Sequence, residues 1–193
     1  GPCLTTAEGV SCYGTTSAVT RIQNGIAERV LTGLPSTAFP NGDSGSGATD
    51  IAFDSAGNPF ILFSWIGTPA QRASDSRFSP FATLVRVDNF NSTPTFATIA
   101  DLEAVFHPRL VPSPFGGPAF SMQSVPTSIA RGPDGAFYVG ELTGFPFPKD
   151  QARVYRINPN NNQPEVFATG FTNIIDIDFD LFGNLYVLEY ATN

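Results

Sequence analysis

Three polar residues each precede the isoleucine that begins one copy of an internal repeat (Ile51, Ile129 and Ile177). They are Asp50, Ser128 and Asp176. If their segments line one channel, their hard oxygen atoms could ring it and hold a cation such as Ca²⁺. The other interpretation is that they cap strand ends or accept hydrogen bonds from neighbouring backbone. The sequence leaves both interpretations open and identifies no metal.

Two glutamates occupy a second repeated position. Glu141 and Glu189 end the second strands of two copies, one residue past the equivalent Gly140 and Leu188, and Ser64 is taken as the corresponding residue of the first copy. Two carboxylates on separate segments can perform acid–base catalysis if they meet at one pocket. The sequence favours the simpler interpretation that both are exposed acids on loops.

The single histidine, His107, lies in the irregular stretch FHPRLVP. A nucleophile–histidine–acid arrangement needs spatial convergence, and no G-x-S-x-G elbow accompanies this residue. The sequence therefore predicts no catalytic residues and favours a non-catalytic protein over an enzyme.

Composition excludes several partner classes. With 10 basic and 17 acidic residues, the chain lacks the basic patches that nucleic acid requires. No apolar run approaches the roughly 18 residues of a membrane-spanning helix. We expect no nucleic-acid partner and no transmembrane segment.

The two cysteines, Cys3 and Cys12, both lie near the N-terminus. A metal site would need further ligands, and the one histidine is distant in sequence. The sequence therefore favours a short-loop disulfide over free thiols. A disulfide predicts an oxidising compartment, so we expect a secreted protein, extracellular or periplasmic.

The elements that carry these residues come from an internal repeat. Three gap-free copies share a glycine at the same place: IAFDSAGNPFIL (51–62), IARGPDGAFYVG (129–140) and IDFDLFGNLYVL (177–188). Each copy reads as two short strands around a tight turn, in which glycine takes the positive-φ position. The chain's 18 Phe, 18 Gly and 17 Pro also indicate many short strands.

Two further strands follow the first and the second copy, and another such pair precedes the first copy at 18–34. One carries an arginine between apolar residues (Arg21, Arg86 and Arg156), and the next runs into a turn. Four short antiparallel strands per repeat predict a β-propeller blade, whereas a β-sandwich would not predict gap-free copies. We expect the arginine stems to cover apolar surface and their heads to reach acids of adjacent blades.

The predicted organisation is a single all-β propeller domain over 1–193. Its blades are 49–102, 126–171 and a shared closing blade made of 18–34 with 174–193, with an irregular insert at 103–125. Three blades are too few, because closed propellers have about 4–8. Either the chain is part of a six-bladed ring, or another copy completes it through the half-blades 18–34 and 174–193.

Several stretches resemble one family. They are SMQSVPTSIARGPDGAFYVGELTGFPFP (121–148), ARVYRI (152–157), ATGFTNIIDIDFD (168–180), CYGTTSAVTRI (12–22), ERVLTGLPS (28–36) and FATLVRVD (81–88). The chain is similar to the ScyD/ScyE family, secreted propeller proteins related to NHL repeats and associated with scytonemin sunscreen biosynthesis. The resemblance implies six blades, with residues 104–106 joining across an absent blade and one more segment after 190. It implies no catalytic residues.

Three functions follow as expectations. The first is a secreted, non-catalytic binding or scaffold protein, linked through the resemblance to scytonemin-type secondary metabolism. The second is a structural subunit of an extracellular assembly or filament formed by strand or blade completion between chains. The third is a metal-dependent hydrolase or lactonase, which the low count of convergent polar residues disfavours.

Overall fold

The computed structural model describes residues 1–6, 9–106, 109–123, 125–158 and 160–190. Strands hold 54% of the chain and helices 6%, which confirms the predicted all-β class. The strands are β1 (Cys3–Thr6), β2 (Gly9–Gln23), β3 (Ile26–Ala38), β4 (Ser46–Phe53), β5 (Pro59–Phe63), β6 (Thr83–Asp88), β7 (Thr95–Asp101), β8 (Leu110–Val111), β9 (Phe120–Ser121), β10 (Pro126–Arg131), β11 (Phe137–Glu141), β12 (Ala152–Asn158), β13 (Gln163–Phe171), β14 (Ile174–Phe179) and β15 (Leu185–Glu189).

Short helical turns lie in the connections between strands. The α-helix α1 (Pro69–Ala73) and the 3₁₀ turn η1 (Ser76–Phe78) join β5 to β6, and α2 (Glu103–Phe106) follows β7. Thr68 and Gln71 cap the start of α1 reciprocally, each side chain accepting from the other's backbone N–H. Within the described residues, no helix has the length and apolar character needed to cross a membrane.

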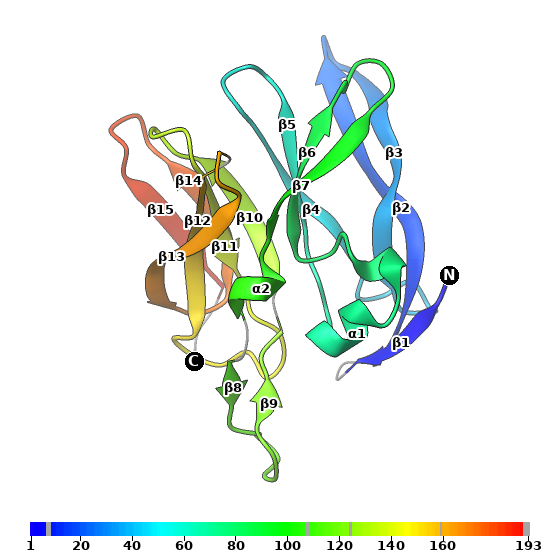
Figure 1. Cartoon of the computed structure of the whole chain (residues 1–193), viewed down its shortest axis with the longest axis vertical. Coiled ribbons are helices and arrows are strands. Elements are labelled where there is room, and N and C mark those ends of the chain that lie inside the picture. The colour runs from blue at the N-terminus through cyan, green and yellow to red at the C-terminus, as the bar shows by residue number, and fades with distance from the viewer. Residues whose placement is uncertain (7–8, 107–108, 124, 159, 191–193) are drawn as a thin grey trace.

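The first sheet runs through β1 to β7 in chain order, with all neighbours antiparallel. Its joint between β3 and β4 is narrow, because only Ser36 with Gly47 and Thr37 with Ser46 pair there. Beyond that joint, β2 and β3 separate from β4–β7 (Figure 1). We call β2–β3 the leading hairpin and β4–β7 the first unit. Leu31 and Leu34 of the hairpin pack against the first unit.

A second four-stranded antiparallel sheet, β10–β13, repeats the strand order of the first unit, and we call it the second unit. The two units share a buried apolar cluster in which Phe60 and Phe137 have ring centroids 4.2 Å apart. The strands β14 and β15 form a separate two-stranded sheet, the terminal hairpin, whose Ile174 and Ile177 pack on the second unit. Apolar side chains therefore hold the leading hairpin, the first unit, the second unit and the terminal hairpin together in a row, and we call these four parts the pieces of the structure.

The repeated phrase forms the first two strands of the first unit, of the second unit and of the terminal hairpin, in one register. Ile51 pairs with Ile61, as Ile129 does with Val139 and Ile177 with Val187. In the turn of the first copy, the Asp54 carboxylate accepts from the backbone N–H groups of Ala56 (2.9 Å) and Asn58 (2.8 Å). Gly57 has φ +82°. Asp54 and Gly57 are thus turn residues, because only glycine adopts this φ without strain.

The first strands of the pieces, β4, β10 and β14, lie side by side across the molecule. The Thr49 hydroxyl of β4 donates to the carbonyl of Pro126 in β10 (3.5 Å), and the equivalent Thr127 donates to Ile174 in β14 (2.7 Å). The order is therefore leading hairpin, first unit, second unit, terminal hairpin (Figure 1).

The predicted sharing of one blade by 18–34 and 174–193 is not met within a single chain. The described parts of the two segments lie in different sheets at opposite ends of the molecule (Figure 1). The reason is geometrical: each piece stacks on its neighbour, and the rotation over four pieces does not bring the last piece against the first. Residues 191–193 lie outside the described residues.

The insert 103–125 contains little regular structure. After α2, the short strands β8 and β9 form a hairpin that projects below the sheets (Figure 1). The Met122 backbone N–H donates to the Arg109 carbonyl (2.8 Å), which closes the base of this hairpin. Val111 and Met122 are buried, so the base of the hairpin belongs to the core.

Candidate functional site

Asp50, Ser128 and Asp176 lie on the neighbouring first strands β4, β10 and β14, as the repeat predicts. Each pairs across its own hairpin at the same register, with Leu62, Gly140 and Leu188 respectively. The negative charge of Asp176 acts on Asp50 and disfavours its ionisation. The structure therefore brings these side chains into one row.

Asp50 accepts hydrogen bonds from two backbone groups. Its Oδ1 accepts from the N–H of Ile51 (2.7 Å), and its Oδ2 accepts from the N–H of Ile129 in the second unit (2.8 Å). Burial raises the pKa of Asp50, and these two hydrogen bonds partly offset that rise by stabilising the charged form. The carboxylate thus joins the first unit to the second.

The equivalent residues do not repeat this joint. Ser128 is buried, and its Oγ makes no hydrogen bond with the described residues. Asp176 accepts from the backbone N–H of Ile177 next to it (2.9 Å). The backbone-bonding interpretation of the row is therefore realised at Asp50 and Asp176.

The cation interpretation needs more ligands than the row supplies. Calcium takes about 6–8 oxygen ligands. Among the described residues, no group of three or more His, Cys, Asp and Glu side chains could hold a metal ion. Both oxygens of Asp50 also receive backbone donors. The residues present do not fit a resident cation.

Glu141 is not the exposed acid that the sequence suggested. It is fully buried at the end of β11, forms a salt bridge with Arg109, and accepts from the Tyr155 hydroxyl (3.2 Å). Arg109 also donates to the carbonyl of Gln151 (2.6 Å), which links the start of the β8–β9 hairpin to the second unit. Burial raises the pKa of Glu141 to about 8, although the Arg109 charge and the Tyr155 hydrogen bond oppose the rise.

Glu189 has a different environment. It is exposed at the end of β15, and its carboxylate accepts from the backbone N–H of Thr172. Glu141 and Glu189 thus have separate partners, and nothing in these contacts joins them into an acid–base pair. In the first unit, Phe63 occupies the corresponding place, because Ala48 pairs with Phe63 as Pro126 pairs with Glu141. The assignment of Ser64 to this position was wrong by one residue.

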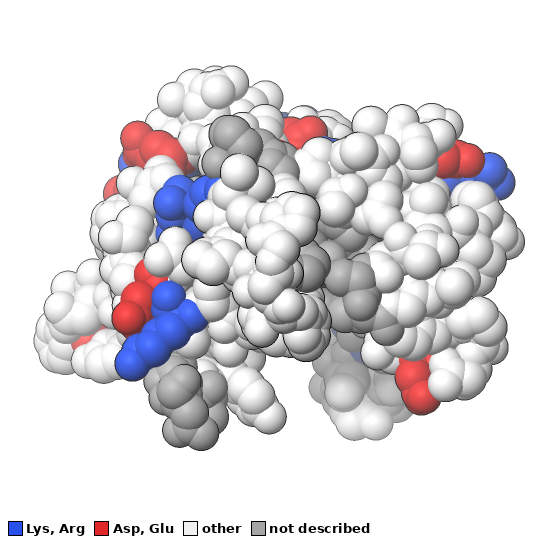
Figure 2. Space-filling view, turned by 90° about the horizontal axis from the view of Figure 1, so that it is seen from below, with Lys and Arg blue, Asp and Glu red and all other residues white. Residues whose placement is uncertain are grey.

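The recurring arginines pair within their own piece, not with adjacent ones. Arg21 bonds Glu28 on the paired strand (2.7 Å), and Arg86 bonds Asp88 two residues along β6 (2.7 Å). Arg156 bonds both Asp134 (2.7 Å) and Glu165 (2.8 Å) of the second unit. Figure 2 shows one face of the molecule on which basic side chains lie beside acidic ones.

One buried acid escaped the sequence analysis. Glu103 at the start of α2 is buried beside Arg72 and Asp101, and burial raises its pKa to about 7. Arg72 pairs with Asp101 (2.9 Å) and donates to the carbonyl of Ser79 (2.7 Å). Glu103 follows an outer strand in a non-repeating segment, so no pattern marks it. His107 lies outside the described residues.

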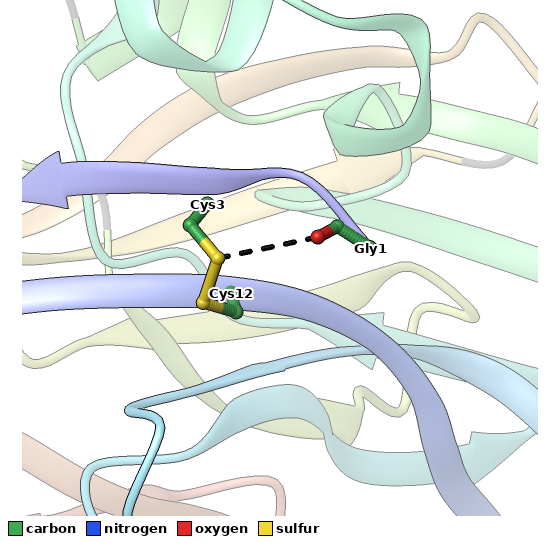
Figure 3. The surroundings of a disulfide bond; sticks show 3 residues. All are labelled: Gly1, Cys3 and Cys12. Carbon is green, nitrogen blue, oxygen red and sulfur yellow. Dashed lines mark hydrogen bonds between the residues drawn. A yellow bond between two sulfur atoms is a disulfide. The ribbon is translucent and has the colours of Figure 1, made fainter.

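The predicted disulfide joins Cys3 to Cys12 (Figure 3). The two residues face each other across β1 and β2. A further backbone bond runs from the N–H of Tyr13 to the carbonyl of Pro2 (2.8 Å), so the N-terminal segment is fastened along the lower part of β2.

Comparisons with models of protein families, with curated proteins and with solved structures found no match. The class that the geometry defines is an all-β protein built of repeated antiparallel units stacked through their first strands.

The joint made by Asp50 can be measured by substitution. Asp50→Ala leaves the N–H of Ile129 without this acceptor, and we expect a loss of about 1–3 kcal/mol of unfolding free energy. Asp176→Ala is the matched control, because it removes only the bond to the adjacent Ile177, and we expect a loss below about 1 kcal/mol. Urea unfolding followed by circular dichroism measures both, and equal losses would contradict the joint.

The ionisation of Glu141 predicts a pH dependence. Since burial raises its pKa from 4.5 to about 8, the folded chain holds this proton more tightly than the unfolded chain. The resulting stability is present at low pH and is lost as the pH rises through about 8. The unfolding free energy of the wild type minus that of Glu141→Gln should fall by on the order of 4 kcal/mol between pH 4.5 and pH 9.

The control for this titration is Gln163→Asn, which changes an exposed side chain at the start of the neighbouring strand β13 and removes no titratable group. The same difference measured with this variant should stay flat over the range. A Glu141→Gln difference that rises with pH would show that Arg109 keeps the carboxylate ionised and would reverse the assigned direction.

Proposed function

We propose that this chain is a secreted, non-catalytic β-propeller protein that acts as a binding or scaffold protein at the cell exterior. The observation that carries the proposal is the stacking of the first and second units through β4 and β10, with Asp50 bonded to Ile129. Consecutive four-stranded antiparallel sheets arranged in this way are the building plan of a propeller. On this view the two units are blades, and the leading and terminal hairpins are halves of further blades.

The use of the polar residues supports a non-catalytic role. Asp50 and Asp176 bond backbone N–H groups, while Glu141 is enclosed with Arg109 and Tyr155. A catalytic acid or base must reach the proton that it transfers. These groups face the protein's own backbone and side chains, so their contacts serve the fold.

The compartment and the pathway belong to the same proposal. A disulfide between Cys3 and Cys12 is compatible with an oxidising compartment, where such bonds persist. The resemblance to the ScyD/ScyE family extends the proposal to a supporting role in scytonemin-type secondary metabolism.

The metal content of the purified protein distinguishes the proposed binding or scaffold protein from a metal-dependent hydrolase or lactonase. We expect purified protein to carry a divalent ion only in substoichiometric amounts, and added Ca²⁺ to leave the melting temperature unchanged, because a ligand that binds the folded state raises it. Elemental analysis and thermal unfolding measure the two. A stoichiometric ion that disappears in the Asp50→Asn, Asp176→Asn double variant would favour the enzyme.

A second candidate function, assembly through blade completion by a second copy, is favoured by two open strand edges. β1 covers the edge of β2 only from Gly9 to Cys12, and the described residues place no strand on the rest of that edge or on the outer edge of β15. Open edges of this kind accept strands from other chains.

The exposed side chains of β15 also favour a second copy of the chain as the partner. Tyr138 of the second unit is 6% exposed because the terminal hairpin covers it, whereas the equivalent Tyr186 is 62% exposed. Its neighbours on the same face, Leu188 and Tyr190, are also exposed. If β15 joins β2 of another copy, the first unit of that copy would cover this face, and two chains would close a six-bladed ring.

Native mass determination tests this assembly. The closed ring predicts a particle of twice the 20.6 kDa chain mass, and Tyr186→Lys should shift it towards single chains by placing a charge in the new interface. Leu181→Lys is the matched control, because Leu181 is fully exposed at the turn of the same hairpin. A wild type that stays a single chain at all concentrations would exclude the second candidate.

A further inference from the structure

An apolar pocket of about 260 Å³ opens between the leading hairpin and the first unit. Its walls are formed by Leu34 of β3, Phe63 of β5, Val85 of β6 and Phe96 of β7. Leu34, Phe63 and Val85 are buried, whereas Phe96 at the rim is 52% exposed. The pocket is thus an inlet from the surface into the core between two sheets.

The polar groups of this pocket are few and uncharged. Thr32, Ser79 and Thr98 contribute hydroxyl groups, and none of the described residues that line it is charged. A charged ligand would lose its hydration there without gaining a partner of opposite sign. The chemistry of the lining therefore selects an uncharged, mainly apolar molecule that carries a hydrogen-bonding group.

The second unit shows what fills the equivalent place elsewhere in this chain. Val85 pairs with Ile61 as Tyr155 pairs with Val139, so Val85 and Tyr155 occupy the same position of their units. Tyr155 is fully buried against the first unit, with its hydroxyl bonded to Glu141. The first unit has only a valine at this position.

The residue beside this position also differs in type between the two units. Glu141, the partner of Tyr155, is replaced by Phe63 in the first unit, so the groove there loses its acid together with its phenol. Phe63 and Val85 both line the pocket, so the pocket lies beside the two positions that Glu141 and Tyr155 occupy in the second unit. Its wall has gained an aromatic side chain, which can stack on a bound ring.

The volume limits the size of the occupant. An apolar cavity of about 150 Å³ accepts benzene. A pocket of about 260 Å³ accordingly has room for more than one ring but not for a large polycyclic molecule.

We propose that this pocket binds a small, uncharged aromatic molecule of one or two rings that carries a hydroxyl or carbonyl group. The ring lies between Leu34, Phe63 and Val85, beside Phe96, and its polar group meets a threonine or serine hydroxyl. This inference rests on the proposed binding function and names the class of ligand that the protein binds.

The test uses 2-naphthol, an uncharged bicyclic aromatic alcohol, titrated into the full chain and followed by its fluorescence anisotropy. We expect saturable binding of one molecule per chain. Thr98→Trp should weaken it by at least about tenfold, because the indole occupies the pocket of which Thr98 forms one side.

The matched control is Val166→Trp, because Val166 pairs with Tyr155 as Thr98 pairs with Val85, but its groove is already filled. This variant should bind 2-naphthol as the wild type does. Phe96→Ala, which removes the rim aromatic without adding bulk, should also weaken binding and covers the case in which Thr98→Trp fails to fold. The anion 2-naphthoate should bind more weakly than 2-naphthol.

Absence of saturable binding, or binding that neither Thr98→Trp nor Phe96→Ala weakens, would overturn the pocket. Equal binding of 2-naphthoate would overturn the selection of an uncharged ligand. Failure here is distinguishable from failure of the proposed function: a stoichiometric metal ion lost with Asp50 and Asp176 would overturn the non-catalytic role and leave the 2-naphthol result standing.

Discussion

Each central sheet must be covered on both faces, and the rest of the structure depends on this constraint. All five residues of β5 are buried: alternate side chains face the leading hairpin through Ile61 and Phe63, and the second unit through Phe60 and Leu62. A strand of this kind exposes apolar surface unless a neighbour lies on each side. Stacking is therefore a condition for the units to fold, and the hydrogen bond from Ile129 to Asp50 fixes how they meet.

The fold was predictable where the sequence repeats. Asp54 and Gly57 determine a turn locally, and the strands beside it pair in the same register in every copy. The relative position of the hairpins at the two ends was not predictable, because it depends on the rotation from each sheet to the next. No single residue type determines that rotation. The strands expected in 18–34 and 174–193 are present, but their described residues lie in separate sheets of the chain.

The candidate sites show the same division. Sequence equivalence placed Asp50, Ser128 and Asp176 in one row, but it could not tell a cation ligand from a backbone acceptor, since both need the same carboxylate oxygen. The burial of Glu141 depends on Arg109, which comes from a segment without a repeat. Arg156 reaches acids of its own unit because antiparallel neighbours are closer than the next sheet.

The N-terminal crosslink has a consequence for the free edge beside it. The disulfide holds β1 along β2 from Gly9 to Cys12, and the bond from the Tyr13 N–H to the Pro2 carbonyl continues this contact by one residue. Beyond Tyr13, the described residues place no strand on the same edge. If a strand of another copy adds to this edge, as proposed above, it must end where the disulfide-linked N-terminal segment lies against Tyr13. The disulfide would then fix the register of the added strand, which an uncovered edge leaves free to shift.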